Sequence, residues 1–297
     1  MINNITTIIK KYPSLIRAYY ACMSLIPDKQ YTSWHFRRKL GYGIDWKDPK
    51  TFNEKLQWLK LYWNEPLATI CADKYQVRDY IIELGLEDIL NNIYGVYNSV
   101  EEIDIDKLPN AFVLKATHAS GLNIICKDKS KIDWDKAFRE MRRWFKINYY
   151  NFNRERMYKD IIPRIICERY LDNEDNQSLI DYKFLCFNGE PLISFVCLDR
   201  FDELKVDFYD IGWNKIPFSR HYPNSSYAIP RPELYEAMLE ICKVLSQQFP
   251  FVRVDLYEVK GKIYFGELTF IPGNGTEEFT PFEYDKMLGD LIQLPIK

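Results

Sequence analysis

Apolar residues in the first part of the chain recur with helical spacing. Phe52, Leu56 and Leu59 lie three to four positions apart, which places them on one side of a helix. No glycine-rich turn between a strand and a helix occurs in residues 1–66, so a dinucleotide-binding fingerprint is absent from its usual place. This pattern predicts a mainly helical N-terminal segment over residues 1–66.

Beyond this segment, helical patterns alternate irregularly with short strand-like runs. Helices are predicted over 73–84, over 134–147, and from Pro232 to about residue 249. Strands are predicted over 93–97, 112–117, 164–171, 181–189, 192–198, 251–259 and 262–270. The last two strands form a hairpin around Lys260 and Gly261.

The predicted helix over 134–147 separates its apolar residues from its cations. The apolar stripe comprises Trp134, Phe138, Met141 and Phe145. The cations elsewhere on this helix are Arg139, Arg142, Arg143 and Lys146. Such a cluster is ordinarily a solvated face, and contact with an anionic ligand is the alternative.

The composition is that of a globular protein. The chain has 297 residues, of which 47% are hydrophobic, and this suffices for one large core or two smaller ones. No run of about 18 apolar residues occurs, and Lys10, Lys11 and Arg17 interrupt the N-terminal apolar stretch before a signal-peptide core forms. We therefore expect a cytoplasmic protein without an integral membrane segment; a position near the inner face of the membrane stays open.

Charge and metal-ligand content argue against several functional classes. Lys and Arg total 40 and Asp and Glu total 42, a formal charge of −2 that gives no overall attraction to nucleic acid. The three histidines lack the spacing of zinc ligands. The seven cysteines are odd in number and scattered, which indicates reduced thiols. Any anionic ligand must therefore be held by local charges.

The final predicted hairpin carries charges where a buried strand normally has apolar residues. Alternation places Arg253 and Asp255 on one face of its first strand, and it groups Glu267 with Thr269 on the second. A three-residue loop at 260–262 sets Asp255 opposite Glu267. Facing carboxylates repel by roughly a few tenths of a kcal/mol, and a magnesium ion between them removes the repulsion. The alternative is that each carboxylate pairs with a surface Lys or Arg.

Charged residues also interrupt three other apolar runs, at Lys115, Glu168 and Lys183. A lysine is a poor resident of a buried strand unless its ammonium group meets an anion. The small-residue loop after Lys115, at 118–123, is suited to cradle phosphate through its backbone N–H groups. A lysine on an edge strand beside an ordinary turn is the alternative.

Six short segments follow one another in a characteristic order. They are ADKY (72–75), FVLKATHASG (112–121), ICERYL (166–171), DYKF (181–184), VRVDLY (252–257) and FGELTF (265–270). In this order they resemble the ATP-grasp superfamily, in particular its TupA-like branch of teichuronopeptide biosynthesis. The resemblance implies an α+β fold in which two subdomains grip ATP, a small lid subdomain over 67–175 and a C-terminal subdomain over 176–297.

The resemblance also implies roles for the matching residues. The implied ATP ligands are Lys74, Lys115, His118, Ser120, Gly121, Glu168, Arg169, Leu171, Asp175 and Lys183. Within this set, Lys74 and Lys115 are expected to reach the phosphates, and the loop at 118–121 to close over them. Glu168 is expected near the adenine amino group, with the backbone of Arg169 and Leu171 at the purine edge. Asp175 is expected near the ribose hydroxyls.

The implied magnesium ligands are Asp255, Glu267 and Thr269, with Arg253 and Lys183 as catalytic cations. One departure is visible, because many relatives have Asn at the position of Thr269, whose hydroxyl is a weaker metal ligand. Either Thr269 serves, or Asn274 in the following loop replaces it, or one magnesium ion is bound more loosely. The usual N-terminal nucleotide fold of the superfamily is not recognisable, so substrate-binding residues do not carry over.

These implications point to an ATP-dependent carboxylate–amine ligase that works through an acyl phosphate, with ATP and Mg²⁺ as cofactors. For this branch the implied substrates are a uronic acid of a bacterial surface polysaccharide or its precursor, and an amino acid or small amine. Arg200, Arg220 and His221 are candidate ligands for the substrate carboxylate, since Arg binds carboxylates bidentately. Ordinary surface positions are the alternative for all three.

Two other functional classes stay open. A glycosyltransferase would use an Asp-x-Asp pair for a metal-bound nucleotide sugar, and Asp104-Ile105-Asp106 matches that string. This string lies in a Lys- and Pro-bounded connection, which is typical of a solvated loop. A non-catalytic nucleotide-binding protein would tolerate loss of the metal carboxylates, yet both are present.

Overall fold

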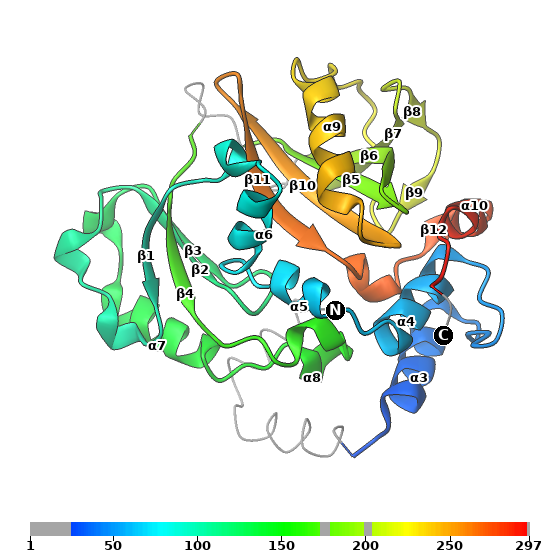
Figure 1. Ribbon diagram of the computed structural model, residues 1–297, viewed down its shortest axis with the longest axis horizontal. Coiled ribbons are helices and arrows are strands. Elements are labelled where there is room, and N and C mark those ends of the chain that lie inside the picture. Colours follow the sequence, from blue (N-terminus) through cyan, green and yellow to red (C-terminus); the bar gives the residue numbers. More distant parts are fainter. Residues whose placement is uncertain (1–24, 173–178, 199–203, 296–297) are drawn as a thin grey trace.

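The computed structural model describes residues 25–172, 179–198 and 204–295, which fold into two antiparallel sheets with helices around them (Figure 1). The helices are α3 (Asp28–Leu40), α4 (Phe52–Tyr62), α5 (Pro66–Ala72), α6 (Val77–Glu83), α7 (Trp134–Trp144), α8 (Tyr150–Asn153), α9 (Tyr235–Ser246) and α10 (Glu283–Leu291). The predicted α+β class is confirmed.

The smaller sheet has four strands in the order β1-β4-β2-β3. These are β1 (Ile93–Tyr97), β2 (Phe112–Ala116), β3 (Asn123–Cys126) and β4 (Ile165–Arg169). Leu114 pairs with Cys167, and both are buried with Met141 of α7 in one apolar core. Because side chains alternate along a strand, Lys115 and Glu168 lie on the opposite face of this sheet from α7.

The larger sheet has six strands in the order β11-β10-β5-β6-β7-β8. These are β5 (Asp181–Phe187), β6 (Glu190–Leu198), β7 (Lys205–Asp210), β8 (Lys215–Ile216), β10 (Phe251–Val259) and β11 (Lys262–Thr269). A short pair, β9 (Ser219–Arg220) and β12 (Phe279–Thr280), lies apart from it. The helices α4, α5 and α6 share the apolar core of this larger sheet rather than that of the smaller one.

Helix α9 covers one face of the larger sheet, and the opposite face carries charged residues beside Phe187 and Phe251, which pack against Phe52 of α4. Ser194 on β6 lies within hydrogen-bond distance of the Tyr235 hydroxyl on α9, at 3.0 Å. Ser194 is in register with Phe184 on β5, which in turn pairs with Val254 on β10. The next residues along these strands, including Lys183 and Asp255, therefore face away from α9.

The hairpin of β10 and β11 differs from the prediction at its tip. The predicted three-residue loop is wrong, since Val259 pairs with Lys262 and only two residues, Lys260 and Gly261, form the turn. Both turn residues have positive φ, 53° and 69°, as a tight two-residue turn requires. A bulge between Asp255 and Leu256 then shifts the register by one residue.

The bulge restores the predicted pairing at the charged end of the hairpin. Asp255 lies opposite Glu267 and Arg253 lies opposite Thr269, as predicted. The extra residue of the bulge is Gly266, and a Cβ atom there would lie 2.9 Å from Tyr257 Cε2 and 3.0 Å from the Asp255 carbonyl oxygen. Glycine is therefore required for the strands to approach this closely.

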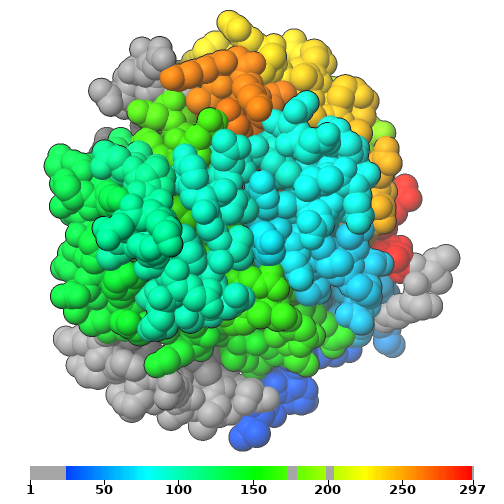
Figure 2. All heavy atoms as spheres, turned by 60° about the vertical axis from the view of Figure 1, so that its left-hand side comes forward, coloured from blue at the N-terminus to red at the C-terminus, as the bar shows by residue number. Residues whose placement is uncertain are grey.

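The two sheets lie side by side, with α5 and α6 next to them (Figure 2). Figure 2 shows the smaller sheet and its surroundings in teal and green, beside the segment of α5 and α6 in cyan.

In the described part of the chain, six cysteines are free thiols. The described helices include none with the length and apolar character needed to cross a bilayer.

Candidate active site

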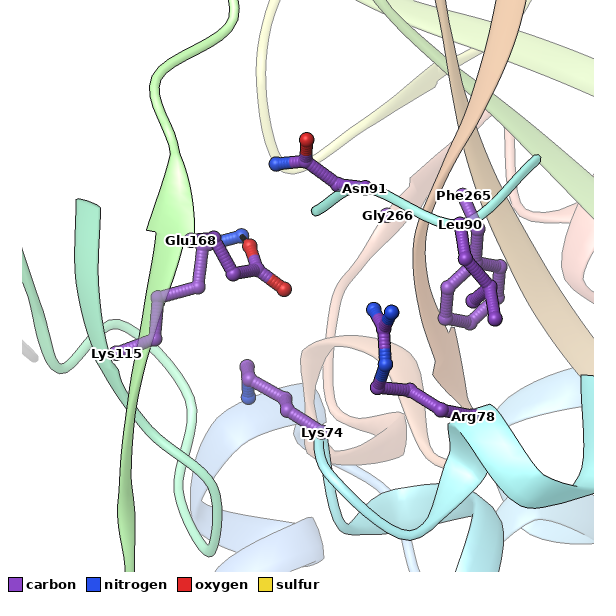
Figure 3. Close-up of a pocket in the computed structure, with 8 residues that line it drawn as sticks. All are labelled: Lys74, Arg78, Leu90, Asn91, Lys115, Glu168, Phe265 and Gly266. Atoms are coloured by element: carbon purple, nitrogen blue, oxygen red, sulfur yellow. Dashed lines mark hydrogen bonds and ion pairs between the residues drawn. The ribbon is translucent and has the colours of Figure 1, made fainter. Parts of the chain in front are cut away.

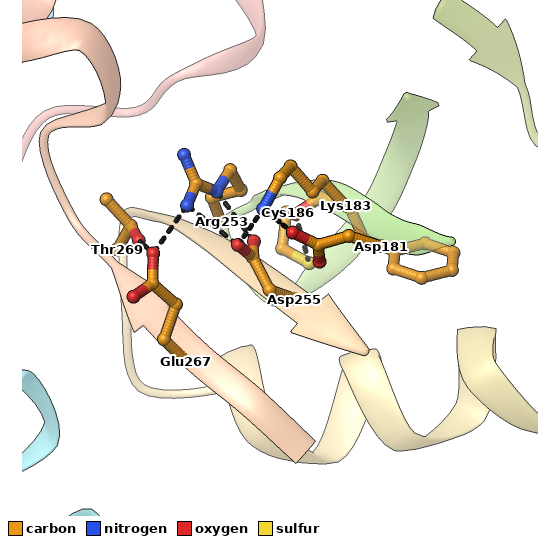
Figure 4. Close-up of polar contacts among 8 residues, drawn as sticks. Asp181, Lys183, Cys186, Arg253, Asp255, Glu267 and Thr269 are labelled. Atoms are coloured by element: carbon orange, nitrogen blue, oxygen red, sulfur yellow. Dashed lines mark hydrogen bonds and ion pairs between the residues drawn. The ribbon is translucent and has the colours of Figure 1, made fainter. Parts of the chain in front are cut away.

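Asp255 on β10 and Glu267 on β11 meet two cations, Arg253 on β10 and Lys183 on β5 (Figure 4). Arg253 donates from Nε to Asp255 Oδ1 at 2.6 Å and from Nη2 to Glu267 Oε1 at 2.7 Å. Lys183, from the neighbouring strand β5, forms ion pairs with Asp255 and with Asp181, the latter at 2.6 Å. The sequence left open that Asp255 and Glu267 each pair with a surface Lys or Arg. Both carboxylates do pair with cations, but these cations belong to the same sheet and are not surface residues.

We call this set the carboxylate network, comprising Asp181, Lys183, Arg253, Asp255, Glu267 and Thr269. Asp255 is 1% exposed and Lys183 is 8% exposed, whereas the side chain of Glu267 is 30% exposed. Three carboxylates and two cations leave one net negative charge. Because the Glu267 side chain is more exposed than Asp255 and Lys183, a further cation would approach the network at Glu267.

The pKa values of the network follow from burial and these contacts. Burial by itself would raise the pKa of Glu267, but Arg253, Lys74 and Lys183 more than offset it and lower the pKa to about 2. Burial also raises the pKa of Asp255, while Arg253 and Lys183 in direct contact oppose that rise. Asp255 in turn raises the pKa of Lys183 against the effect of burial.

The donor set of the network fits magnesium. Asp255 and Glu267 lie opposite each other on adjacent strands, and the Thr269 hydroxyl donates to Glu267 Oε1 at 2.9 Å. Both Asp255 oxygens accept from Arg253, at 2.6 and 2.7 Å, so a metal ion would share this carboxylate with the Arg253 guanidinium. Among the described residues, no three His, Cys, Asp or Glu side chains form a metal-binding group. One or two carboxylates completed by phosphate oxygens are, however, the ligand set that Mg²⁺ prefers. The network therefore suits a magnesium ion that arrives with a nucleotide.

A pocket lies between the face of the smaller sheet opposite α7 and strand β11 (Figure 3). Its lining residues are Lys74, Arg78, Leu90, Asn91, Lys115, Glu168, Phe265 and Gly266. Lys115 Nζ lies 2.6 Å from Glu168 Oε2, so each charge on the sheet face has a partner. We call this site the nucleotide pocket after the role that the sequence analysis predicts for Lys74, Lys115 and Glu168, and it adjoins the carboxylate network because Gly266 directly precedes Glu267.

The predicted purine-edge residues have backbone groups that are already engaged. Arg169 N–H donates to the Asn92 carbonyl oxygen at 2.9 Å, and Asn91 Nδ2 donates to the Arg169 carbonyl oxygen at 2.8 Å. Leu171 lies just beyond β4 and is partly exposed. Asp175 lies outside the described residues. A role for the 169 and 171 backbones in binding adenine stays a prediction.

Lys74 connects the nucleotide pocket to the loop at 118–121. Its backbone N–H donates to the Thr117 carbonyl oxygen at 3.2 Å, and its Nζ donates to the Ala119 carbonyl oxygen at 2.7 Å. Lys74 precedes helix α6 because Asp73 Oδ1 accepts from Tyr75 N at 2.8 Å and forms a turn there. The predicted helix therefore starts later than residue 73. Burial lowers the pKa of Lys74, which favours contact with an anion.

The loop itself divides into a buried and an exposed part. His118 is 2% exposed, and its Nε2 lies 2.9 Å from the Trp144 carbonyl oxygen. Ser120 and Gly121 are exposed, and Gly121 has φ of 73° with open space around it. The structure thus leaves Ser120 and Gly121 available to a phosphate, whereas His118 anchors the loop to the end of α7.

Asn274 faces α4 rather than the carboxylate network. Its Oδ1 accepts from Lys60 Nζ at 2.9 Å, and Gln57 Nε2 donates to the carbonyl oxygens of Asn274 and Gly275, both at 2.7 Å. Asn274 lies between two glycines in a turn, Pro272–Gly275, with left-handed φ at three successive residues. Of the two alternatives for the third magnesium ligand, the structure places Thr269 next to Glu267.

Of the candidate substrate ligands that the structure describes, Arg220 is buried and His221 is exposed. Arg220 is 4% exposed, pairs with Glu277 at 3.1 Å and donates to the Pro272 carbonyl oxygen at 2.9 Å. Its guanidinium also lies over the rings of Phe52 and Phe279. His221 is exposed, and Arg200 lies outside the described residues. Arg220 therefore supports the turn at 272–275, and we do not propose it as a substrate ligand.

Several pocket residues were not predicted from the sequence. Arg78 lies four positions after Lys74, in the first turn of α6, and Phe265 and Gly266 belong to the FGELTF segment, whose predicted site residues are Glu267 and Thr269. Asn91 follows an apolar residue in a polar connection and carries no motif. Only the spacing of Lys74 and Arg78 offered a signal, since positions four apart share a helix face.

The chain belongs to the TupA-like ATP-grasp family, whose family model matches residues 54–293. The predicted family is thereby confirmed, and with it the ATP-grasp fold. No curated protein matches the chain.

Solved structures with a similar fold include several ligases. D-alanine–D-alanine ligase from Bacillus anthracis, complexed with ATP, is 16% identical with a TM-score of 0.42, and the match covers 69% of this chain and 55% of that one. The same enzyme from Helicobacter pylori is 14% identical with a TM-score of 0.45, over 83% and 68% of the two chains. An L-amino acid ligase from Bacillus licheniformis is 15% identical with a TM-score of 0.39, over 71% and 44%. The chain thus spans about half the length of the first of these relatives.

The position of Glu168 predicts a role in selecting the base. We expect Glu168→Ala to reduce the preference for ATP over GTP by about tenfold, since a hydrogen bond to a charged group contributes about 1.5–3 kcal/mol. Lys115→Met serves as the control and should weaken both nucleotides alike. Isothermal titration with ATP and GTP checks the prediction, and an unchanged ratio in the Glu168 variant would remove Glu168 from the adenine site.

Proposed function

We propose that this protein is an ATP-dependent carboxylate–amine ligase that activates a carboxylate as an acyl phosphate. The observation that carries the proposal is the carboxylate network, with its one net negative charge, beside the nucleotide pocket. Gly266 lines the nucleotide pocket and Glu267 follows it directly in the chain. A nucleotide in that pocket would therefore present its phosphates to the network.

The residues of the chain supply charge to the transferred phosphoryl group. Arg253 and Lys183 are held by Asp255 and so cannot swing away, which is the preorganisation that stabilises charge developing in a transition state. Magnesium held by Asp255 and Glu267 would supply further positive charge next to the phosphate oxygens. Lys74 and Lys115 would hold the remaining phosphates.

The proposed reaction has two steps, formation of an acyl phosphate and its reaction with the amine. An oxygen of the substrate carboxylate attacks the γ-phosphorus of ATP, and the bond to the ADP oxygen breaks. The amine then attacks the carbonyl carbon of the acyl phosphate, inorganic phosphate leaves with the electron pair, and the amine loses a proton. Water must be excluded between the two steps, because an acyl phosphate hydrolyses when solvent reaches it.

For the substrates we propose a uronic acid of a bacterial surface polysaccharide or its precursor, and an amino acid or small amine. This finer assignment rests on the resemblance to the branch of teichuronopeptide biosynthesis alone. The glycosyltransferase alternative gains no support from Asp104, whose Oδ1 accepts from Asp106 N at 3.1 Å and whose carboxylate pairs with Lys107 at 3.0 Å on the surface. Both contacts are those of an ordinary loop.

Hydroxylamine trapping tests the proposal. Incubation with ATP, Mg²⁺, a uronic acid and hydroxylamine should yield ADP and a uronic hydroxamate in equal amounts. The Glu267→Gln variant is the matched control and should yield neither. The proposal would be overturned if ADP were released but none of the uronic acids offered gave a hydroxamate. It would also be overturned if the protein transferred a sugar from a nucleotide sugar.

A further inference from the structure

One buried carboxylate, Glu155, lies outside the carboxylate network. Glu155 is 4% exposed and follows Arg154, whose φ of 61° is left-handed. Glu155 Oε1 accepts from Asn153 Nδ2 at 3.2 Å, and within the described ranges no cation lies at ion-pair distance from this carboxylate. Arg154, its neighbour in the chain, pairs instead with Asp28 at 3.7 Å. A carboxylate buried with one amide partner still lacks a cation or a proton.

Lys60 on α4 acts on Glu155 without neutralising it by contact. Lys60 is 2% exposed, and its Nζ donates to Asn274 Oδ1 at 2.9 Å. Burial raises the pKa of Glu155 to about 7, and Lys60 opposes this rise. Burial likewise lowers the pKa of Lys60 to about 8. Glu155 can therefore gain or lose a proton near neutral pH.

A 3₁₀ turn, Arg156–Tyr158, brings Glu155 near the carboxylate network. The turn follows α8 and packs against α5 (Figure 1). Tyr158 N–H donates to the Glu155 carbonyl oxygen at 3.1 Å, and Tyr158 lines a hollow together with Lys74 and Glu267. Burial raises the pKa of Tyr158, and Glu155 and Glu267 raise it further. The Tyr158 hydroxyl is therefore within electrostatic reach of both carboxylates.

Tyr149 connects the same region to the loop at 118–121. Its ring packs edgewise against Tyr158, with ring centroids 4.9 Å apart. Burial raises the pKa of Tyr149, Glu155 and Glu267 add to this rise, and a hydrogen bond with Ser120 opposes it. Glu155 and the two tyrosines thus adjoin both the loop expected to close over the phosphates and a carboxylate that would hold magnesium.

We propose that Glu155 binds the ammonium group of the amine substrate and takes up the proton that the amine loses as it attacks. The inference rests on the proposed function. An amine attacks through its free electron pair, so an ammonium ion must first give a proton to a base. The N–H bond breaks toward Glu155, the nitrogen pair forms the bond to the carbonyl carbon, and inorganic phosphate leaves with the pair of the broken C–O bond. A primary ammonium group is also the cation that this buried carboxylate lacks.

Two nucleophiles that differ in their need for a base test the inference in turnover. At neutral pH hydroxylamine is mostly uncharged, whereas methylamine is an ammonium ion like the lysine side chain, whose pKa is about 10.4. With galacturonate and MgATP, Glu155→Gln should form the methylamide at least about 100-fold more slowly than the wild type, because a positioned base contributes roughly 100- to 10,000-fold. Hydroxamate formation by this variant should be unchanged. Equal loss of both products, or loss of neither, would overturn the inference.

Glu54→Gln is the matched control. Glu54 is 6% exposed, and its carboxylate accepts from the backbone N–H groups of Lys50 and Thr51 before α4. The control makes the same chemical change at another buried carboxylate and should lower stability. It should leave the ratio of methylamide to hydroxamate as in the wild type, so a shift of that ratio in both variants would also overturn the inference.

A binding measurement on the full chain decides the role of Glu155 without turnover. The carboxyl ¹³C signal of Glu155, assigned by its absence from the spectrum of Glu155→Gln, is followed as methylammonium chloride is added. We expect a saturable shift that potassium chloride at equal ionic strength does not produce, and the absence of such a shift would overturn the inference. Failure of every uronic acid to yield a hydroxamate would instead refute the proposed function. If the wild type forms hydroxamate but no methylamide, the NMR measurement decides.

Discussion

Glu267→Gln is expected to reduce ATP turnover by at least about 100-fold while the protein stays folded. Glutamine keeps the size of the side chain and its contacts with Arg253 and Thr269, so only the charge is lost. The remaining network then has two carboxylates and two cations and is balanced. Turnover is measured as ADP release at increasing Mg²⁺ concentration, and the variant should not be rescued by excess metal.

The stability of the same variant provides a second readout. The folded protein lowers the pKa of Glu267 from 4.5 to about 2, so the charged form stabilises the fold above about pH 4.5. The stability difference between wild type and variant should therefore shrink as the pH falls from 4.5 toward 2. Asp255→Asn is the contrasting variant, because it removes the 1% exposed anion that Arg253 and Lys183 share; each cation keeps one carboxylate, Glu267 or Asp181, and the variant should lose more stability than Glu267→Gln. Near-normal turnover of Glu267→Gln would remove the metal-site assignment.

Gly266→Ala is expected to reduce the turnover number by roughly 10- to 100-fold, since a misplacement of about 1 Å at a reacting group has an effect of this size. The new Cβ would meet Tyr257 and the backbone of Asp255 at 2.9 and 3.0 Å. Relief of these contacts moves Glu267 relative to Asp255 and changes the spacing of the metal carboxylates.

Gly261→Ala is the matched control for this prediction. Gly261 lies at the tip of the same hairpin with φ of 69° and has open space around it. Its replacement should cost about 1–2 kcal/mol of stability through the left-handed backbone, without effect on turnover. Turnover and thermal unfolding of both variants separate the two effects. A Gly266→Ala enzyme with wild-type turnover would show that the bulge does not set the geometry of the site.

The pairing of Asp255 with Glu267 could be predicted from alternation in two strands, because the side-chain period of a strand is strict. The three-residue loop predicted at the tip of the hairpin was nevertheless wrong. A two-residue turn and a bulge at Gly266 shift the register twice, and the shifts cancel at the charged end. A single sequence offers few signs of a bulge beyond an isolated glycine in a strand.

The contacts of Asn274 and Arg220 could not be predicted, because they depend on packing between segments far apart in the chain. Lys60 and Asn274 are separated by 214 positions, and Arg220 meets Pro272 across 52. An Arg beside a His in a polar segment looks like a substrate ligand, and only its burial between two aromatic rings shows its supporting role. The place of Arg78 in the pocket could not be predicted for the same reason, since the pocket is formed by five separate segments.

Helix α4 sets a limit on how far this protein can be shortened. Asn53, Gln57 and Lys60 recur on one side of the helix, and Asn53 and Gln57 bind the backbone of the segment 274–277 while Lys60 binds the Asn274 side chain. The carbonyl groups of the left-handed turn at 272–275 are thereby satisfied from outside the sheet that carries Glu267. A fragment that begins at α5 would keep every charged residue of the carboxylate network and still lose the support of the turn that follows it. The smallest catalytic unit of this chain therefore includes a helix that contributes none of the residues assigned to the chemistry.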